Sequence, residues 1–388
     1  MTVTLAVPAR TGSKGYFRGT HRACPPEETW SRIQPLLRAA GVTRVGDVTR
    51  LDTAGIPVFQ AVRPGSHTLA VTLGAGLTPA LARVSTAMAS LELWHAERVE
   101  APQNWSAVGA VRANLGYNPY ALPLRAHHLL NDGMVVDWVP ATVLLSGRST
   151  MVPRQCAEYD LRVREEWSPP VFVPSAAGLA CGNTHAEAVL HALYEVLARD
   201  AVATSAAANP AERRAVDPGS VDSDDARRLL DRLAAAGVTV TILDLTGPSG
   251  VPAFEVVADS PEQSAPARGT AAHLDREVAL CRALATAARE RLAVITGVRD
   301  DIPVLGAEDP APRTAPVLDA AALAGSRRAF AEVPTLSTAS FAGDVAEVAD
   351  RIGRTGAGPV LVVDLSRDSA GLPAVRVVVP GLRHLDPG

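Results

Sequence analysis

The chain has 388 residues, of which 47% are hydrophobic, and a formal net charge of −4 at pH 7. Its length can bury one large core or two ordinary ones, and the lack of a basic excess argues against nucleic acid or an anionic membrane as the main partner. No apolar run approaches the roughly 20 residues that span a bilayer, and the N-terminus lacks a signal-peptide pattern. Four scattered cysteines, without a CxxC pair, favour reduced thiols over a zinc site or disulfide framework. We therefore expect a cytoplasmic protein.

The first predicted unit is a helix over 27–40 followed by two strands within 41–62, joined by a turn that contains Gly-x-Pro. Thr29 or Glu28 is the expected N-cap of this helix. The same helix–strand–turn–strand pattern recurs over 223–257 and 342–379, and Ser223 with Asp224 caps the second helix. These three units predict one integrated α/β fold over residues 1–388, in which mixed sheets are layered with long helices.

Three long helices lie between these units, over 74–97, 178–203 and 273–295. The first begins with Thr78 as N-cap and Pro79 at its first position, and the third is capped near Asp275. The Gly-rich stretch before Thr78 lacks the lysine of a phosphate loop, so we interpret it as a tight turn. Residues 201–222 are rich in Ala, Pro and charged residues, and residues 303–340 combine Pro, Ala, Ser and Thr. We expect mobile loops in both stretches, with an ordered lid as the alternative for 303–340.

The helix over 178–203 places Glu187, His191 and Glu195 on one face, because they are spaced at i, i+4 and i+8. A Gly-Asn turn precedes it, so carboxylates and helix-start N–H groups suit a cation with bound phosphate. Glu92, on the helix over 74–97, faces the same region if the long helices converge. Solvated acids on an exposed helix face are the alternative interpretation. His191, taken alone, reads as a packing or capping residue.

Several segments are together similar to the YcaO family, and the resemblance covers nearly the whole chain. They are GTHRACPPEETW at 19–30, residues 41–85, GLACGNTHAEAVLHALYEVLARDA at 178–201, residues 273–301, and DLSRDSAGLPAVRVVVPGL at 364–382. The resemblance implies that the protein uses ATP and Mg²⁺ to phosphorylate a backbone amide oxygen of a ribosomally made precursor peptide. Attack by Cys, Ser or Thr then gives an azoline, sulfide gives a thioamide, and an amine gives an amidine.

The resemblance also implies roles for individual residues, although it assigns no catalytic residue. Glu92, Glu187 and Glu195 match acidic positions that hold the nucleotide through Mg²⁺. Ser85, Asn183, Arg199 and Arg291 match positions of the nucleotide site, and Asp200 ends the same run as Arg199. Arg289 stands where the family commonly has Gln, and we hypothesise that it pairs with phosphate directly.

Other positions depart from the family pattern, which usually places acids at Ala89, Ala198 and Thr286. Their loss removes oxygen ligands, so ATP and Mg²⁺ binding is expected to be weakened or altered. The favoured interpretation is a divergent standalone enzyme of the bottromycin-type branch, which makes an amidine macrocycle. One alternative is azoline or thioamide formation, and another is a catalytically degenerate scaffold or partner protein. The chain begins almost at the shared core, so we expect no separate peptide-recognition domain. The expected partner is the precursor peptide, with homo-oligomer formation left open.

Overall fold

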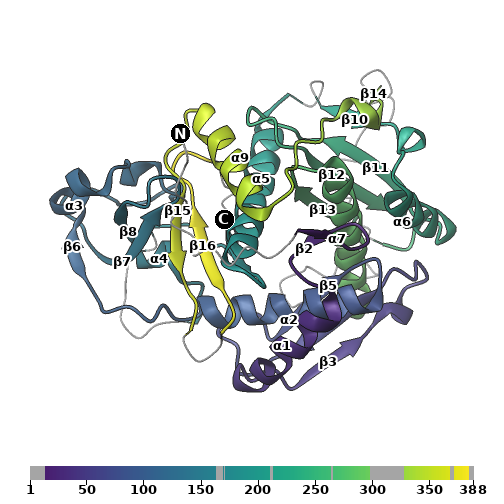
Figure 1. Ribbon diagram of the computed structural model, residues 1–388, viewed down its shortest axis with the longest axis horizontal. Coiled ribbons are helices and arrows are strands. Elements are labelled where there is room, and N and C mark those ends of the chain that lie inside the picture. Colours follow the sequence, from purple (N-terminus) through teal and green to yellow (C-terminus); the bar gives the residue numbers. More distant parts are fainter. Residues whose placement is uncertain are drawn as a thin grey trace.

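Four sheets organise the computed structural model, which describes residues 14–162, 169, 171–209, 213–263, 265–297, 327–367 and 371–383 (Figure 1). A hairpin pairs β1 (Gly15–Tyr16) with β2 (His21–Arg22), and a small sheet has the order β3 (Arg44–Asp47), β4 (Val58–Val62), β5 (Val71–Ala75). The six-stranded sheet runs β6 (Trp105–Ala107), β7 (Val135–Val143), β15 (Leu361–Asp364), β16 (Ala374–Val378), β9 (Leu179–Cys181), and β8 (Ser149–Pro153) also pairs with β7. The five-stranded sheet runs β13 (Ala267–Ala272), β12 (Ala253–Asp259), β11 (Thr239–Asp244), β10 (Arg214–Val216), β14 (Arg327–Arg328), and only its β10–β14 pair is parallel among the described pairs.

The helices cover these sheets and connect them. The long ones are α2 (Pro79–Ala96), α5 (His185–Ala207) and α7 (Arg276–Thr296). α1 (Pro26–Ala39), α6 (Asp224–Ala235) and α9 (Phe341–Arg354) each precede a pair of antiparallel strands, β3–β4, β11–β12 and β15–β16 respectively. The short elements are α3 (Val108–Leu115), α4 (Arg154–Ala157), η1 (Thr49–Leu51), η2 (Pro119–Ala121), η4 (Pro218–Ser220) and η5 (Phe330–Glu332).

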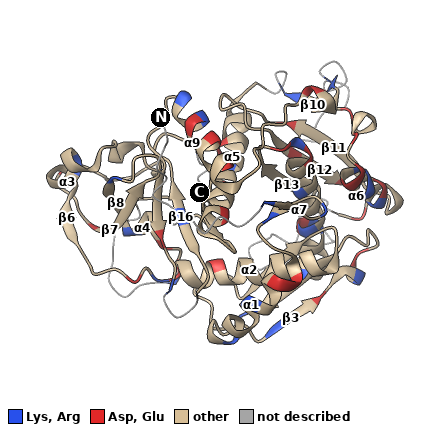
Figure 2. Ribbon diagram, in the orientation of Figure 1, with Lys and Arg blue, Asp and Glu red and all other residues tan. Residues whose placement is uncertain are grey.

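The layers follow from strand residues that alternate between two apolar faces. Ala374 and Val378 of β16 pack into a core with α1 and α2, whereas Val375 and Val377 pack into a second core with α5 and α9. The five-stranded sheet likewise turns one face toward α6 and α7. α5 therefore lies between the two large sheets, and α2 and α7 cover their outer faces (Figure 1). Charged residues gather mostly on helices and connections, while the strands of the six-stranded sheet carry few (Figure 2).

The predicted long helices are present, and so are most of their caps. The side chains of Thr78, Ser223 and Asp275 accept backbone N–H bonds at the starts of α2, α6 and α7. The predicted cap of the first helix is wrong, because α1 begins after Pro25 and Thr29 lies within it. No helix among the described residues is long and apolar enough to cross a membrane.

Parts of the two stretches predicted to be mobile loops form regular structure. α5 continues through Ala207, because an alanine-rich stretch favours helix, and β10 pairs with β11 inside the five-stranded sheet. Within the predicted loop over 303–340, residues 327–328 form β14 and residues 330–332 form η5. Residues 303–326 of that loop lie outside the described part of the chain.

Candidate functional site

The glycine-bracketed turn before α5 is fixed by close packing on both sides. Gly178 has a φ of +78°, and a Cβ atom there would lie 2.2 Å from the carbonyl oxygen of Val377. At Gly182 a Cβ atom would lie 2.5 Å from the backbone nitrogen of Ala188. Only glycine fits both positions, so the turn can fold back onto the first turn of α5. Thr184 then caps α5 through a hydrogen bond from the Glu187 N–H.

The three predicted metal-binding acids gather where α2 and α5 meet β9. Glu92 projects from α2 and accepts the backbone N–H of Cys181 at 3.0 Å. Glu187, in the first turn of α5, accepts the N–H of Asn183 at 3.1 Å and is only 2% exposed. Glu195 lies two turns further along α5 and interacts electrostatically with Glu92. The structure therefore brings Glu92, Glu187 and Glu195 into one region, which we call the acid cluster.

Two arginines neutralise this cluster. Arg22, from the β1–β2 hairpin, approaches Glu187 with 3.8 Å between Nε and Oε1. Arg282, from α7, approaches Glu195 with 3.3 Å between Nη2 and Oε1. Like-charged carboxylates repel one another unless a cation joins them, and guanidinium groups serve that purpose in this structure. The acid cluster is thus assembled from α2, α5, α7 and the hairpin.

His191 lies between the two arginines and makes polar contacts with both. The sequence alone indicated only a packing or capping role. Arg22 Nη1 contacts His191 Nε2, and Arg282 Nη1 lies 3.2 Å from His191 Nδ1. Burial and the two positive charges lower the pKa of His191 well below its ordinary value, so the imidazole is neutral. A neutral imidazole accepts a hydrogen bond at one nitrogen only, whereas guanidinium nitrogens only donate. One of these two contacts therefore brings two N–H donors together, although each arginine has another acceptor, the His21 carbonyl oxygen for Arg22 and Glu195 for Arg282.

Burial also changes the acids. It raises the pKa of Glu92 from 4.5 to about 7, with Glu195 adding to the rise, while the Cys181 N–H and both arginines oppose it. Burial likewise raises the pKa of Glu187, although Arg22 and the Asn183 N–H act against it. Burial lowers the pKa of Arg22 to about 10, so it remains positive at neutral pH. Shifts of this kind are concentrated at functional sites.

Among the described residues, no group of three or more His, Cys, Asp and Glu side chains is arranged to hold one metal ion. The three acids are therefore close together without surrounding a single ion position. Mg²⁺ bound together with a nucleotide takes one or two protein carboxylates and completes its shell with phosphate oxygens and water. The acid cluster fits that requirement, and it does not fit a metal cage made of protein ligands alone.

Three of the residues predicted to bind the nucleotide lie on or next to α2 and α5, the helices that carry the acids, and the other two lie on α7. Asn183 borders the acid cluster, where its side-chain oxygen accepts from Thr29 Oγ1 at 3.1 Å, and Ser85 lies on α2 two turns before Glu92. Arg199 is exposed on α5, one turn beyond Glu195. Asp200, beside it, accepts the N–H of Arg383 at 2.7 Å.

The other two arginines, on α7, are engaged elsewhere. Arg289 pairs with its neighbour Glu290 at 2.6 Å. Arg291 is buried, pairs with Asp52 at 3.0 Å and donates to Ser260, about 14 Å of helix beyond Arg282. The structure therefore does not bring Arg291 to the acid cluster, and its contacts are those of a residue that fixes α7 to neighbouring loops.

The three positions at which the family pattern usually has acids, Ala89, Ala198 and Thr286, differ in their surroundings. Ala198 is 5% exposed and belongs to the apolar core that α5 shares with α9. Ala89 and Thr286 are partly buried on α2 and α7. Ala198 therefore presents a packed methyl group to this core.

Arg22 and Arg282 were not assigned to the site from the sequence. The segment 19–30 carries Arg22, and Arg282 precedes Thr286 and Arg289 by one and two turns on one face of α7. Three acids predicted to lie close together repel one another unless positive charge lies among them. This repulsion was the signal in the sequence that basic partners had to exist. Nothing in sequence spacing links a two-stranded hairpin to α5, so Arg22 required the tertiary structure.

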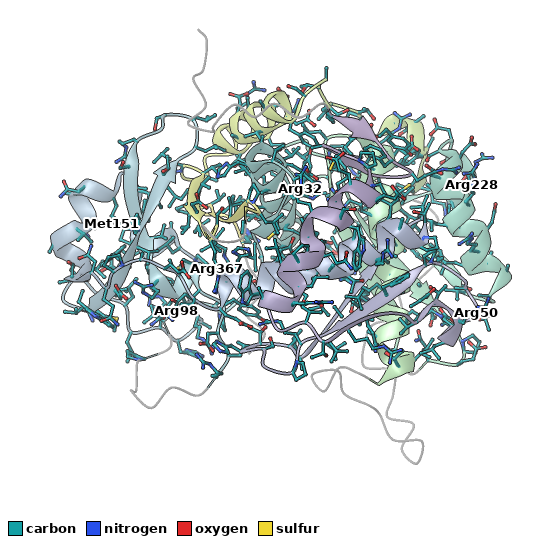
Figure 3. The ribbon with its side chains drawn as sticks, turned by 60° about the horizontal axis from the view of Figure 1, so that its bottom comes forward. Arg32, Arg50, Arg98, Met151, Arg228 and Arg367 are labelled. Atoms are coloured by element: carbon teal, nitrogen blue, oxygen red, sulfur yellow. The ribbon has the colours of Figure 1, made fainter. Side chains whose placement is uncertain are left out.

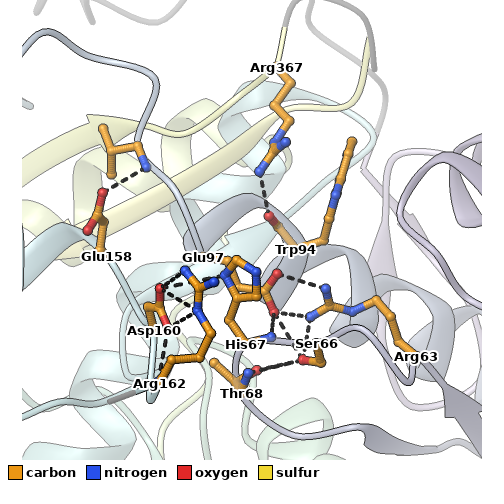
Figure 4. Close-up of polar contacts among 11 residues, drawn as sticks. Arg63, Ser66, His67, Thr68, Trp94, Glu97, Glu158, Asp160, Arg162 and Arg367 are labelled. Atoms are coloured by element: carbon orange, nitrogen blue, oxygen red, sulfur yellow. Dashed lines mark hydrogen bonds and ion pairs between the residues drawn. The ribbon is translucent and has the colours of Figure 1, made fainter. Parts of the chain in front are cut away.

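A second buried polar cluster lies at the end of α2 (Figure 4). There Arg63 pairs with Glu97, which also accepts from Ser66 Oγ at 3.0 Å and from the N–H of His67 at 2.8 Å. Burial acts to raise the pKa of Glu97, but these donors outweigh it and the pKa is lowered. Each oxygen of Glu97 has donors, so we assign this cluster a structural role.

A cavity of about 830 Å³ opens beside the hairpin, and the three acids of the acid cluster do not line it. Its walls come from the hairpin and from the starts of α1, α2, α6 and α7. We call it the hairpin cavity, and its lining residues are Tyr16, Phe17, Arg18, Pro26, Glu27, Thr78, Leu81, Asp222, Ser223, Asp224, Asp225, Arg228 and Glu277.

Comparison with known proteins places this geometry in context. A family model described as YcaO cyclodehydratase, ATP- and Mg²⁺-binding, matches residues 73–383. An uncharacterized protein of Mycobacterium tuberculosis is 41% identical over 286 residues, which cover 74% of this chain and 64% of that protein. The chain thus spans less than two thirds of this relative's length.

Solved structures share the fold. A heterocyclase in complex with substrate and cofactor superposes with a TM-score of 0.80 at 21% identity, covering 97% of this chain and 54% of that one. YcaO from Methanopyrus kandleri, bound with AMPPCP and Mg²⁺, gives a TM-score of 0.78 at 22% identity and covers 97% of this chain and 100% of that one. The expected mixed α/β architecture of long helices and several sheets is confirmed.

Proposed function

The chain belongs to the YcaO family, and on that premise we propose that it uses ATP and Mg²⁺ to activate a backbone amide of a ribosomally made precursor peptide for cyclodehydration. The observation that carries the proposal is the acid cluster. Three carboxylates and two guanidinium groups from four separate elements meet there, with His191 between the arginines. Such a mixture suits a metal–triphosphate, which presents both positive and negative charge.

The paired charges indicate how the residues receive a nucleotide. Arg22 and Arg282 are the donors that can turn toward phosphate oxygens, and one of their two contacts with His191 brings donor to donor. With the arginines turned toward phosphate, Glu187 and Glu195 would be the residues that hold Mg²⁺ in place of the guanidinium groups. The bound ATP supplies the phosphoryl group that makes the amide oxygen a leaving group. The protein residues hold and orient the charges, which is the main contribution that phosphoryl transfer needs.

We further propose that Glu92 is kept at the cluster for metal binding and not for stability. Burial raises its pKa to about 7, so the fold disfavours the ionised form, and an uncharged group of the same shape would be more stable there. Proteins commonly retain such costly groups where function requires them. The proposal assigns Glu92, Glu187 and Glu195 to the metal, and Ser85, Asn183 and Arg199 to the nucleotide.

For the product we propose an amidine macrocycle, formed when the amino terminus of the peptide attacks the activated amide. The divergence at Ala89, Ala198 and Thr286, and the resemblance to the amidine-forming branch, support this choice. Such a reaction needs a held amide and a neutral amine in a folded peptide loop, so positioning supplies much of the rate.

Mass spectrometry tests the proposal. The protein is incubated with candidate precursor peptides, ATP and Mg²⁺, and we expect loss of one water from one of them, which N-acetylation of that peptide abolishes. Water loss that instead depends on one Cys, Ser or Thr of the peptide indicates an azoline, and exchange of oxygen for sulfur indicates a thioamide. No mass change together with no nucleotide binding contradicts an enzymatic function.

A further inference from the structure

The hairpin cavity lies next to the proposed reaction site, because the two share structural elements. The hairpin that supplies Arg22 to the acid cluster also supplies Tyr16, Phe17 and Arg18 to the cavity. α7 supplies Arg282 to the cluster and Glu277 to the cavity. A volume of about 830 Å³ is in the range that holds a small ligand or a few peptide residues.

The walls of the cavity carry more negative than positive charge. Asp222 pairs with Arg276 at 3.3 Å, and the buried Asp225 pairs with Arg228 at 3.2 Å and with Arg18 at 3.5 Å. Within the described part of the chain, the other three lining carboxylates have no basic partner, namely Glu27, Asp224 and Glu277. Unpaired carboxylates in one concave space repel phosphate and attract a cation.

Tyr16 shows where that cation is most needed. Its hydroxyl lies 2.6 Å from Glu277 Oε1 and 2.8 Å from Asp225 Oδ2. A phenol has one proton to donate, so it serves only one of the two carboxylates. Asp225 has its arginines, whereas Glu277 depends on Tyr16 alone among the described groups. A ligand that brings N–H donors and positive charge supplies what this pair lacks.

The cavity also has an apolar wall that suits a long cationic side chain. Tyr16 is 46% exposed although it is a large ring, and Phe17 lies beside it on the same lining. Aromatic faces attract guanidinium and ammonium groups and cover the methylene stems of arginine and lysine. Arg228 lies on α6 at the edge of the molecule (Figure 3), and it competes for Asp225 with any incoming cation.

We propose that the hairpin cavity binds an arginine or lysine side chain of the precursor peptide and thereby holds the peptide beside the acid cluster. The inference that the cation belongs to a peptide substrate rests on the proposed function. The preference for a cationic side chain rests on the cavity itself.

The test uses the full chain and three blocked alanine pentapeptides, with arginine, citrulline or glutamate at the centre, and measures affinity by NMR titration. Citrulline has nearly the shape of arginine without its charge. We expect the arginine peptide to bind about tenfold or more tightly than the citrulline peptide, because charged hydrogen bonds are the stronger kind. The glutamate peptide is expected not to bind. Equal affinity for arginine and citrulline peptides overturns the proposal.

Two variants change the affinity in opposite directions. Glu277→Gln is expected to weaken binding of the arginine peptide about tenfold, whereas Arg228→Gln is expected to strengthen it, because a competing cation is removed. A misfolded protein cannot produce the second result. Glu255→Gln is the matched control, because it removes a β12 carboxylate that pairs with Arg268 of β13, away from the cavity. If neither cavity variant changes the affinity, the proposal is wrong.

ATP binding, measured in the same variants, separates this inference from the proposed function. We expect Glu277→Gln and Arg228→Gln to bind ATP with Mg²⁺ as the unmodified protein does. A wild-type protein that binds the arginine peptide but never ATP retains the cation site and loses the proposed function. Variants that lose ATP binding and keep peptide binding place the nucleotide in the cavity and overturn the inference.

Discussion

Replacing Glu92 by glutamine tests whether the buried negative charge of this residue lowers the free energy of unfolding. Burial raises the pKa of Glu92 from 4.5 to about 7 in the folded protein, with Glu195 contributing. The folded state therefore binds the proton more strongly than the unfolded chain between those pH values. Its free energy of unfolding must then fall as the pH rises through this window. At 1.36 kcal/mol per pKa unit, the full difference is about 3 kcal/mol.

Glutamine keeps an oxygen for the Cys181 N–H and carries no charge. We expect Glu92→Gln and the unmodified protein to have similar stability at pH 4, and the variant to be more stable by up to about 3 kcal/mol at pH 8. Urea unfolding across this pH range, with a chelator and without nucleotide, measures the difference. Glu100→Gln, at an exposed carboxylate just beyond α2, is the control for losing one charge. A difference between Glu92→Gln and wild type that does not change with pH refutes the reasoning.

Other parts of the fold give further predictions. Lys14, the only lysine, is buried against Asp344, so Lys14→Met should cost about 3–5 kcal/mol in urea unfolding by leaving that carboxylate unpaired. At Gly269, where β13 meets α7, a Cβ atom would lie 2.1 Å from the Ala283 carbonyl oxygen, so Gly269→Ala should prevent soluble expression or lower the melting temperature sharply. Gly353→Ala, on the exposed face of α9 with open space around it, should instead be neutral or stabilising by up to about 1 kcal/mol. Thr184→Ala should cost about 1 kcal/mol through the lost cap of α5, and an unchanged urea midpoint would contradict that role.

Local patterns predicted most of the helices because their signals lie within a few residues. Thr78, Ser223 and Asp275 each cap a helix that the apolar periodicity also indicates, so two local rules agree. The stretch 201–222 holds more regular structure than its composition indicates, for a related reason. Its composition resembles a linker, but Ala201–Ala207 extends an existing helix, and β10 is held by neighbours far away in the sequence.

The site was only partly predictable. Glu187 and Glu195 share a helix face by spacing alone, and Glu92 joined them on the assumption that the long helices converge. The family resemblance then implied a metal-binding role for all three. Arg22 and Arg282 are basic residues on separate elements, and only tertiary packing brings them to His191. Arg291 shows the opposite case, since an arginine at the expected position lies in a buried ion pair with Asp52.

The most direct test of the central claim is the Mg²⁺ dependence of ATP binding, measured by isothermal titration for the unmodified protein and for a Glu187→Gln, Glu195→Gln double variant. If the acid cluster holds the nucleotide through the metal, the unmodified protein binds ATP with Mg²⁺ far more tightly than with a chelator. The double variant then loses that difference while keeping its fold. Failure of the unmodified protein to bind ATP with Mg²⁺, or binding by the double variant with the same Mg²⁺ dependence, contradicts the account.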